Sequence, residues 1–320
     1  MDEGAVMGKM RKSVLMMGAL AAACGPAGRD GIARGPGGGD TVVDASSADF
    51  SEPALQFGDG GTITQIGCID ATTCYTVYAH SDDTLYMIEL ASKALAPIGS
   101  FHAPMVGTGK NTFPDVITDL AVAPDNTIYV ISKTVLYTAD PKDGHVTAVG
   151  PVTACGNSAV ALTFMPDGKL YAADYAGAFC QIDITQNPPA VKQIGSLTAG
   201  LAVAGDLVAV ADGTMYATAY LLSDKTGGST NDNLLVKIDP TTGAVSSQIG
   251  PTGFPKMFGI AFSMGEVFGF THDGSGTVVT IDPKTGVGTL YNKFTDPSTG
   301  KGISFAGAGV NAMVAPPPIN

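Results

Sequence analysis

Two histidines that stand next to aspartates are the residues of this sequence best suited to chemistry. His80 lies in YAHSDD and His272 in FTHDGSG, beside Asp82, Asp83 and Asp273. Each follows a stretch whose second residue is aromatic, so we expect both to emerge on the same face of the molecule. A histidine paired with a carboxylate can bind a metal ion or act as a general base. The alternative is that both are solvated loop side chains.

The elements that would position these residues are copies of one hairpin. Asn233–Phe254, NLLVKIDPTTGAVSSQIGPTGF, reads as two strands joined by Asp-Pro-x-Thr-Gly, where aspartate caps the turn, proline presets φ and glycine takes the left-handed corner. Clear copies occupy Val279–Leu290 and Leu136–Val149, and weaker copies occupy Cys180–Ile194 and Leu85–Ile98. A hairpin copied along a chain indicates a repeat architecture.

When the copies of the repeat are aligned, further segments correspond between them, and together they complete a unit of four short strands. Strands with an aromatic second residue begin at Val77, Ile128, Leu170, Met215 and Val267, and apolar runs stand at Leu120, Leu162, Leu201 and Ile260. The aspartates of the hairpin column are 43 to 56 residues apart, similar to one propeller blade. Radial stacking of such sheets protects the edges of short strands. The sequence therefore predicts an all-β fold, a β-propeller of four-stranded antiparallel blades.

The two ends of the repeat region each match only part of a unit. Gly302–Val314 matches the inner strands of Gly259–Thr271, whereas Gly61–Gly67 matches the outermost strand at Gly144–Gly150. We expect these incomplete ends to share one blade and close the ring. Five full units and the shared one predict six blades, with five or seven as alternatives.

The blades carry an LYxIDPxTG pattern, and the chain has no tryptophan, so the signatures of WD40 and quinoprotein propellers are missing. The pattern resembles the loose class of secreted bacterial propellers that is akin to NHL and YVTN repeats. This resemblance covers about Thr62 to Val314. It implies a fold and carries no activity.

A catalytic propeller would need ligands on the first position of its inner strands, where they face the channel. Aligning the runs places Asp119, Ala161, Gly200, Gly259 and Gly302 there, and among them only Asp119 offers a carboxylate. Sugar-lactone hydrolases resemble this fold but use a ring of Glu, Asn and Asp, from which this column departs. We therefore expect Asp119 to cap backbone amides, and we predict no cofactor. A metal-dependent hydrolase or lactonase acting at the channel is the alternative.

The N-terminus has the layout of an export signal. Met10–Cys24, MRKSVLMMGALAAAC, has a basic start, a short apolar run and small residues before a cysteine. It resembles a bacterial lipoprotein signal, which implies lipidation at Cys24, and Gly25 fits sorting to the outer membrane. An ordinary secretory signal is the alternative, and Met1 and Met10 are alternative starts. We expect a signal at residues 1–24, a tether rich in Gly, Ala and Asp at 25–53, and one propeller domain at 54–320.

Cysteine content and charge agree with export. The four cysteines after Cys24 suggest two disulfides in an oxidising compartment. Cys68 and Cys74 flank a short turn, which favours their pairing and leaves Cys155 with Cys180, although three pairings are open. The net charge of −12 makes nucleic acid an unsuitable partner.

Two irregular segments are the candidate recognition loops, because blades keep their shape while inserted loops carry binding. They are the link Phe101–Asp115 and the insertion Tyr220–Asn233. We expect exposed aromatic and polar side chains there that could hold a protein or a carbohydrate; they are Phe101, His102, Phe113, Tyr220, Asp224 and Asn231. The alternative is a pair of drifted surface loops. We expect a non-enzymatic binding or scaffolding lipoprotein of the bacterial cell envelope, in the outer membrane and facing the periplasm or the exterior, with secretion as the alternative.

Overall fold

A computed structural model describes residues 55–56, 62–63, 76–224, 226, 228 and 231–313. Contacts divide the chain into Met1–Pro53 and Ala54–Asn320, and every described residue belongs to the second unit. Within these ranges no helix is long and apolar enough to cross a membrane. The signal, the tether, Cys24, and the Cys68–Cys74 pair lie outside the described residues and stay predictions.

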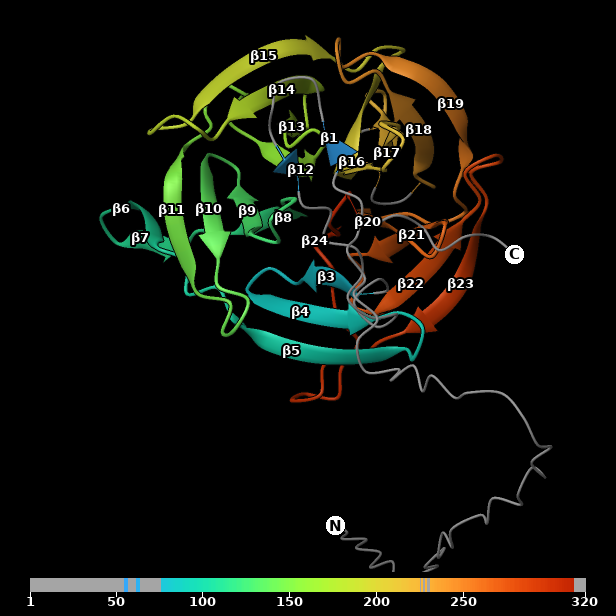
Figure 1. The fold of residues 1–320 in the computed structure, drawn as a ribbon. Coiled ribbons are helices and arrows are strands. Elements are labelled where there is room, and N and C mark those ends of the chain that lie inside the picture. Colours follow the sequence, from blue (N-terminus) through green and yellow to red (C-terminus); the bar gives the residue numbers. More distant parts are fainter. Residues whose placement is uncertain are drawn as a thin grey trace, which may run out of the picture. The chain divides into compact units, whose positions relative to one another are not determined.

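The described residues form five four-stranded antiparallel sheets, here called blades 1 to 5 (Figure 1). Blade 1 consists of β24 (Gly307–Gly309), β3 (Thr76–His80), β4 (Thr84–Glu89) and β5 (Ala94–Ser100). Blade 2 consists of β8 (Ile117–Val122), β9 (Ile128–Ser132), β10 (Val135–Ala139) and β11 (Val146–Pro151). Blade 3 consists of β12 (Ala159–Phe164), β13 (Leu170–Asp174), β14 (Ala178–Asp183) and β15 (Ala190–Ser196).

The remaining strands complete the ring and add two small hairpins. Blade 4 consists of β16 (Leu201–Ala209), β17 (Met215–Leu221), β18 (Leu234–Ile238) and β19 (Val245–Pro251). Blade 5 consists of β20 (Met257–Ser263), β21 (Glu266–Thr271), β22 (Thr277–Ile281) and β23 (Gly288–Lys293). The hairpins are β1 (Leu55–Gln56) with β2 (Thr62–Ile63), and β6 (Met105–Thr108) with β7 (Asn111–Pro114).

The first strand of each blade faces the centre, and these inner strands close a ring. β8, β12, β16 and β20 contact one another in series, and β24 contacts both β20 and β8 (Figure 1). The fold is thus a β-propeller, as predicted. Its ring is closed because the C-terminal strand β24 pairs with β3 near the N-terminal end of the described chain.

The described residues form five blades, which is one of the two alternatives and not the favoured number of six. The unit that begins at Val77 has no apolar run before it, and the C-terminal segment supplies that inner strand, with Gly307 opposite His80 and Gly309 opposite Tyr78. The first unit and the tail are therefore one blade, not two. The strand at Thr62–Ile63 pairs with β1 and joins no blade sheet.

The inner strands of the blades are more buried than the outer strands. Every residue of β12 and β16 is buried, whereas the outermost strands β15 and β19 have no fully buried residue. Neighbouring blades pack through apolar clusters, one of which joins Ile131 and Leu136 of blade 2 to Leu162 and Leu170 of blade 3. Burying these faces supplies the main favourable term in folding.

The Asp-Pro-x-Thr-Gly hairpins form as the sequence predicts. The Asp239 carboxylate accepts the Thr241 N–H at 2.8 Å, and its carbonyl accepts the Gly243 N–H at 2.8 Å. Gly243 has φ of 70°, and a Cβ there would stand 2.6 Å from the Cβ of Phe179 in the neighbouring blade. Glycine is needed both for the turn and for blade packing.

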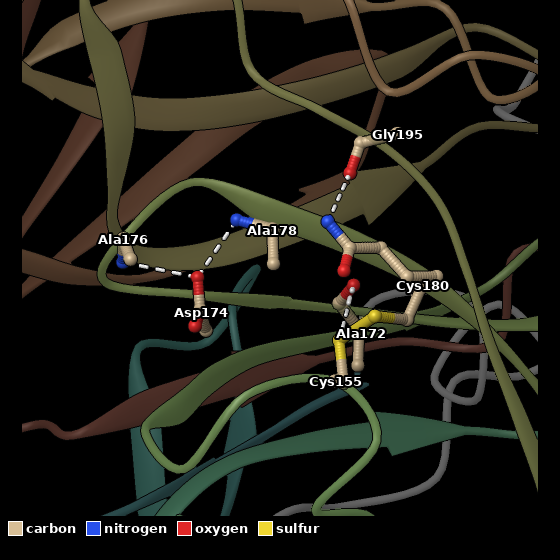
Figure 2. The surroundings of a disulfide bond; sticks show 8 residues. Cys155, Ala172, Asp174, Ala176, Ala178, Cys180 and Gly195 are labelled. Carbon is tan, nitrogen blue, oxygen red and sulfur yellow. Dashed lines mark hydrogen bonds between the residues drawn. A yellow bond between two sulfur atoms is a disulfide. The ribbon is translucent and has the colours of Figure 1, made fainter.

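The disulfide between Cys155 and Cys180 confirms one of the two favoured pairings (Figure 2). It joins the segment before β12 to β14, with a Cα–Cα distance of 5.7 Å, and both residues are fully buried. The bond fastens the entry of blade 3 to its third strand.

The two faces of the ring carry different connections. One face, here called the link face, holds the loops between second and third strands, including 81–83 and 272–276, and the links between blades, including 101–116. The opposite face, the turn face, holds the turns between first and second strands and the Asp-Pro hairpins. His80 and His272 both stand at the link face, because each ends a second strand or directly follows one.

Candidate functional site

The centre of the ring contains two fully buried carboxyl groups, those of Asp119 and Asp206. Asp119 follows a bulge in β8, where the register with β9 shifts between Ile117 and Asp119. Asp206 lies in a larger irregularity of β16, between Val203 and Leu207. The side chains of the two aspartates are hydrogen-bonded to each other. We call this pair the hub.

Each blade contributes one backbone amide to the hub. Asp119 accepts the N–H of Leu120 at 2.8 Å and that of Leu162 at 2.6 Å. Asp206 accepts the N–H groups of Leu207 and Ile260 at 2.6 Å each, and that of Ala308 at 3.3 Å. The hub therefore ties blades 1 to 5 together through their inner strands. Its oxygens are used by the fold, so Asp119 caps amides and is not presented to a ligand.

Burial raises the pKa of both hub carboxyls well above the usual range, and the neighbouring Asp206 charge raises that of Asp119 further. Two carboxylates in contact do not both ionise readily in a dry interior, so the folded pair retains a proton to higher pH than a free aspartate does. We expect this proton on Asp119, because Asp206 accepts three amides and Asp119 two. A hydrogen bond to the charged form stabilises that form.

The sequence alignment of the channel-facing first position of the inner strands, here called the channel column, was wrong in two places. It placed Gly200 and Gly302 in the column, whereas the structure places Asp206 and Gly307 there. The irregularity in β16 adds residues that a fixed register does not anticipate. The repeated pair Asp-Leu, at positions 119–120 and 206–207, is the signal that could have revealed Asp206.

His80 is fully buried next to the hub, so it is not a solvated loop residue. Its Nδ1 contacts the carbonyl of Ser81 at 2.7 Å, and its Nε2 has no hydrogen-bond partner in the described chain. A Cβ at Gly307 would stand 2.5 Å from that Nε2 and 2.3 Å from Oδ1 of Asp119. Burial lowers the pKa of His80 to about 4, so the ring is neutral at physiological pH.

His272 stands at the link face in a surface pair. Its Nε2 lies 3.2 Å from Oδ1 of Asp82, and its ring stacks on Phe258 with centroids 5.0 Å apart. The hydrogen bond from His272 lowers the pKa of Asp82, so this carboxylate stays ionised. Asp273 instead accepts the Ser275 N–H at 2.9 Å inside its own turn.

A cavity of about 560 Å³ opens at the link face between blades 1 and 2. Its lining residues come from the β3–β4 loop, the end of β5 and the link to β8; they are Asp82, Asp83, Ser100, Phe101, His102, Ala103, Phe113, Pro114, Asp115 and Val116. Three of the predicted loop residues, Phe101, His102 and Phe113, thus meet in one place. The cavity is the candidate functional site.

Hydrogen bonds hold the walls of this cavity. The Phe101 N–H donates to the carbonyl of Asp83 at 2.8 Å, and the Asp115 N–H donates to the carbonyl of Pro104 at 2.9 Å, which closes the base of the β6–β7 hairpin. The Tyr137 hydroxyl donates to Asp115 at 2.7 Å. Burial, with a contribution from Asp115, raises the pKa of Tyr137, so it remains a donor.

The prediction that all six loop residues are exposed is wrong for two of them. Phe101 is 1% exposed and packs against the ring of His80 with centroids 5.6 Å apart. Tyr220 is 9% exposed, and its hydroxyl donates to the carbonyl of Tyr175 at 3.0 Å. Phe113, in contrast, is 55% exposed on β7. Aromatic residues next to a loop are often drawn into the interior, because their burial is strongly favourable.

The insertion between β17 and β18 is a second, separate structure. Asp224 accepts the Thr226 N–H at 2.9 Å and is also hydrogen-bonded to the exposed Asn231 side chain. These contacts lower the pKa of Asp224 to about 2. The insertion belongs to blade 4, which adjoins neither blade 1 nor blade 2, and none of its described residues lines the cavity.

The described ranges contain no group of three His, Cys, Asp or Glu side chains arranged to share a metal ion. His102 and His145 approach with ring centroids 5.5 Å apart, but they form a pair only.

No family model matches the sequence, and a search of curated proteins found no match. Solved structures are similar at a low level. A protein of unknown function from Bacteroides caccae has 11% identity and a TM-score of 0.37, with 68% of this chain and 71% of that chain covered. The PQQ-bound aldose sugar dehydrogenase of Streptomyces coelicolor has 16% identity and a TM-score of 0.38, with 57% and 63% covered. The Dos1 propeller has 13% identity and a TM-score of 0.39, with 69% and 61% covered.

Proposed function

We propose that this protein is a non-enzymatic binding or scaffolding propeller, held at the bacterial cell envelope by a lipid on Cys24. Its recognition site is the cavity at the junction of blades 1 and 2. The observation that supports this most directly is the contrast between the two polar regions of the ring. The hub carboxyls are buried and fully used by backbone amides, whereas the cavity opens to solvent with aromatic and carboxylate groups on its walls.

The alternative, a metal-dependent hydrolase acting at the channel, has weaker support. Such an enzyme needs accessible ligands and a position for substrate water. Asp119 and His80, two of the polar candidates named from the sequence, are fully buried. Both carboxyl oxygens of Asp119 accept backbone amides, one from blade 2 and one from blade 3.

Envelope attachment is tested by expressing the full chain in a bacterium with an outer membrane and labelling it with palmitate. The native chain should incorporate label and fractionate with the outer membrane, whereas Cys24→Ala should do neither. Unlabelled native chain released to the medium would refute lipid anchoring and leave secretion.

Recognition is tested by photocrosslinking in intact cells. A photoreactive phenylalanine analogue replaces Phe113 at the cavity, and a matched analogue replaces Asp212 in the β16–β17 turn on the opposite face. We expect adducts from position 113 and none from position 212. Equal yields, or none from position 113, would refute the assignment of the cavity.

A further inference from the structure

The cavity presents carboxylate oxygens that the protein itself leaves unused. Asp82 contacts His272 through Oδ1, Asp83 accepts two hydroxyls of its own turn through Oδ1, and Asp115 accepts the Tyr137 hydroxyl through Oδ2. No donor in the described chain reaches the second oxygen of any of the three. Each aspartate is thus fixed through one oxygen and offers the other.

The walls hold few donors and no permanent positive charge. Among the lining residues, only the Ser100 hydroxyl and the His102 imidazole are side-chain donors, and none is lysine or arginine. The chain as a whole carries a net charge of −12, which attracts cations to the surface. A ligand that complements this site must bring donors and positive charge.

An aromatic face completes the chemistry. Phe113 is 55% exposed beside these carboxylates, and a cation placed over an aromatic ring is attracted to its negative face. A guanidinium or an ammonium satisfies both features, because it only donates and can lie over a ring. A neutral sugar would stack equally well, but its hydroxyls need donors as well as acceptors.

We propose that the cavity binds a cationic side chain, arginine or lysine, of a peptide segment in a partner protein. This inference rests on the proposed recognition function and specifies its ligand. The carboxylates of Asp83 and Asp115 bind the charge, and the Phe113 ring covers its alkyl stem or its cationic face.

The probe is a short blocked peptide, acetyl-Gly-Arg-Gly-amide, titrated into the purified full chain by isothermal calorimetry and by NMR. Its matched neutral counterpart carries citrulline in place of arginine. We expect the citrulline peptide to bind about tenfold more weakly, because it retains shape but loses the charge-assisted hydrogen bonds. Binding should also weaken about fivefold between 50 and 500 mM salt.

Charge-removing variants locate the site. Asp83→Asn and Asp115→Asn each keep the oxygen that accepts the internal hydrogen bond, and each should weaken binding about three- to tenfold. Phe113→Leu should weaken it about threefold. The control Asp212→Asn removes the same charge from an exposed turn on the other face and should change affinity less than about twofold.

Equal affinity for the arginine and citrulline peptides, or no binding of either to the native chain, would overturn this inference without relying on any variant. So would equal effects of the cavity variants and Asp212→Asn. The crosslinking experiment keeps the two failures apart. Adducts from position 113 with a glycan or with a neutral peptide segment would leave the recognition site in place and exclude the cationic ligand.

Discussion

The hub predicts that Asp206→Asn weakens the closure of the ring. The Asp206 carboxylate accepts the Leu207 N–H through Oδ1 and the N–H groups of Ile260 and Ala308 through Oδ2. Asparagine offers one oxygen and a donating NH₂, so one or two buried amides lose their acceptor. At about 1–3 kcal/mol for each unsatisfied buried group, the variant should lose about 2–5 kcal/mol of unfolding free energy.

Asp119→Asn is the matched comparison, because it removes the same carboxyl from the other half of the hub. With the shared proton expected on Asp119, an asparagine NH₂ can replace its hydroxyl as donor to Asp206. One amide, from Leu120 or Leu162, then loses its acceptor. We expect a loss of about 1–2 kcal/mol.

The two variants should also differ in how their unfolding free energy depends on pH. The pKa of Asp119 is raised in the folded state by burial and by the Asp206 charge, so the folded chain retains a proton that the unfolded chain releases. Stability from this proton is present below the ordinary aspartate pKa of 3.8 and is lost as pH rises toward the folded pKa. The slope is about −1.4 kcal/mol per pH unit. Asp119→Asn should remove this slope.

Guanidinium unfolding of the native chain and both variants, from pH 5 to pH 8, measures these effects, and the difference between chains cancels the other titrating groups. Hydrogen exchange should show the Ala308 amide opening first in Asp206→Asn, since β24 closes the ring. The assignment of the proton is refuted if Asp119→Asn costs as much as Asp206→Asn. The hub itself is refuted if both cost less than about 0.5 kcal/mol, the usual range of surface substitutions.

Three further predictions concern the same core. Gly307→Ala should lower the unfolding free energy by about 3 kcal/mol or more, because the new Cβ would stand 2.3 Å from Oδ1 of Asp119, and a normal melting temperature would contradict this contact. The His80 pKa is lowered to about 4, so the contribution of His80 to stability should fall by about 3 kcal/mol as pH drops from 6.5 to 4; this appears as the difference in unfolding free energy between the native chain and a His80→Gln variant, in which the opposite effect of the hub proton cancels, and a difference that does not change with pH would contradict it. Reducing the Cys155–Cys180 bond, which spans 25 residues, should cost about 3 kcal/mol in guanidinium unfolding with and without reductant, and identical curves would show that the bond is dispensable.

The fold could be predicted because local signals and the overall architecture agree. Each Asp-Pro hairpin carries its own capping and turn chemistry, as the contacts of Asp239 show. Blade number was less predictable, because it depends on a long-range pairing between Gly307 and His80. No local sequence signal indicates that the C-terminal strand completes the first blade and does not belong to a sixth blade.

The candidate site was predictable only as a location. Loop length pointed to the link between blades 1 and 2, and the cavity lies there. Whether an aromatic residue lines a wall or fills the core depends on packing, which left Phe113 exposed and buried Phe101. The sequence named Asp82 and Asp83 only as neighbours of His80 and Asp115 only as the end of the link; their convergence on one cavity depends on backbone geometry that a residue pattern does not contain.

The hub makes the centre of the ring less suited than the link face to the proposed recognition. Inner-strand bulges turn the amides that follow them toward the axis, and unpaired amides buried there would each cost free energy. Asp119 and Asp206 satisfy five of them with two side chains. A carboxylate that stabilises the ring in this way cannot release its amides to coordinate a ligand without loosening blade contacts. At the link face, Asp82, Asp83 and Asp115 each use only one carboxylate oxygen within the fold, so the second oxygen is available to the proposed ligand.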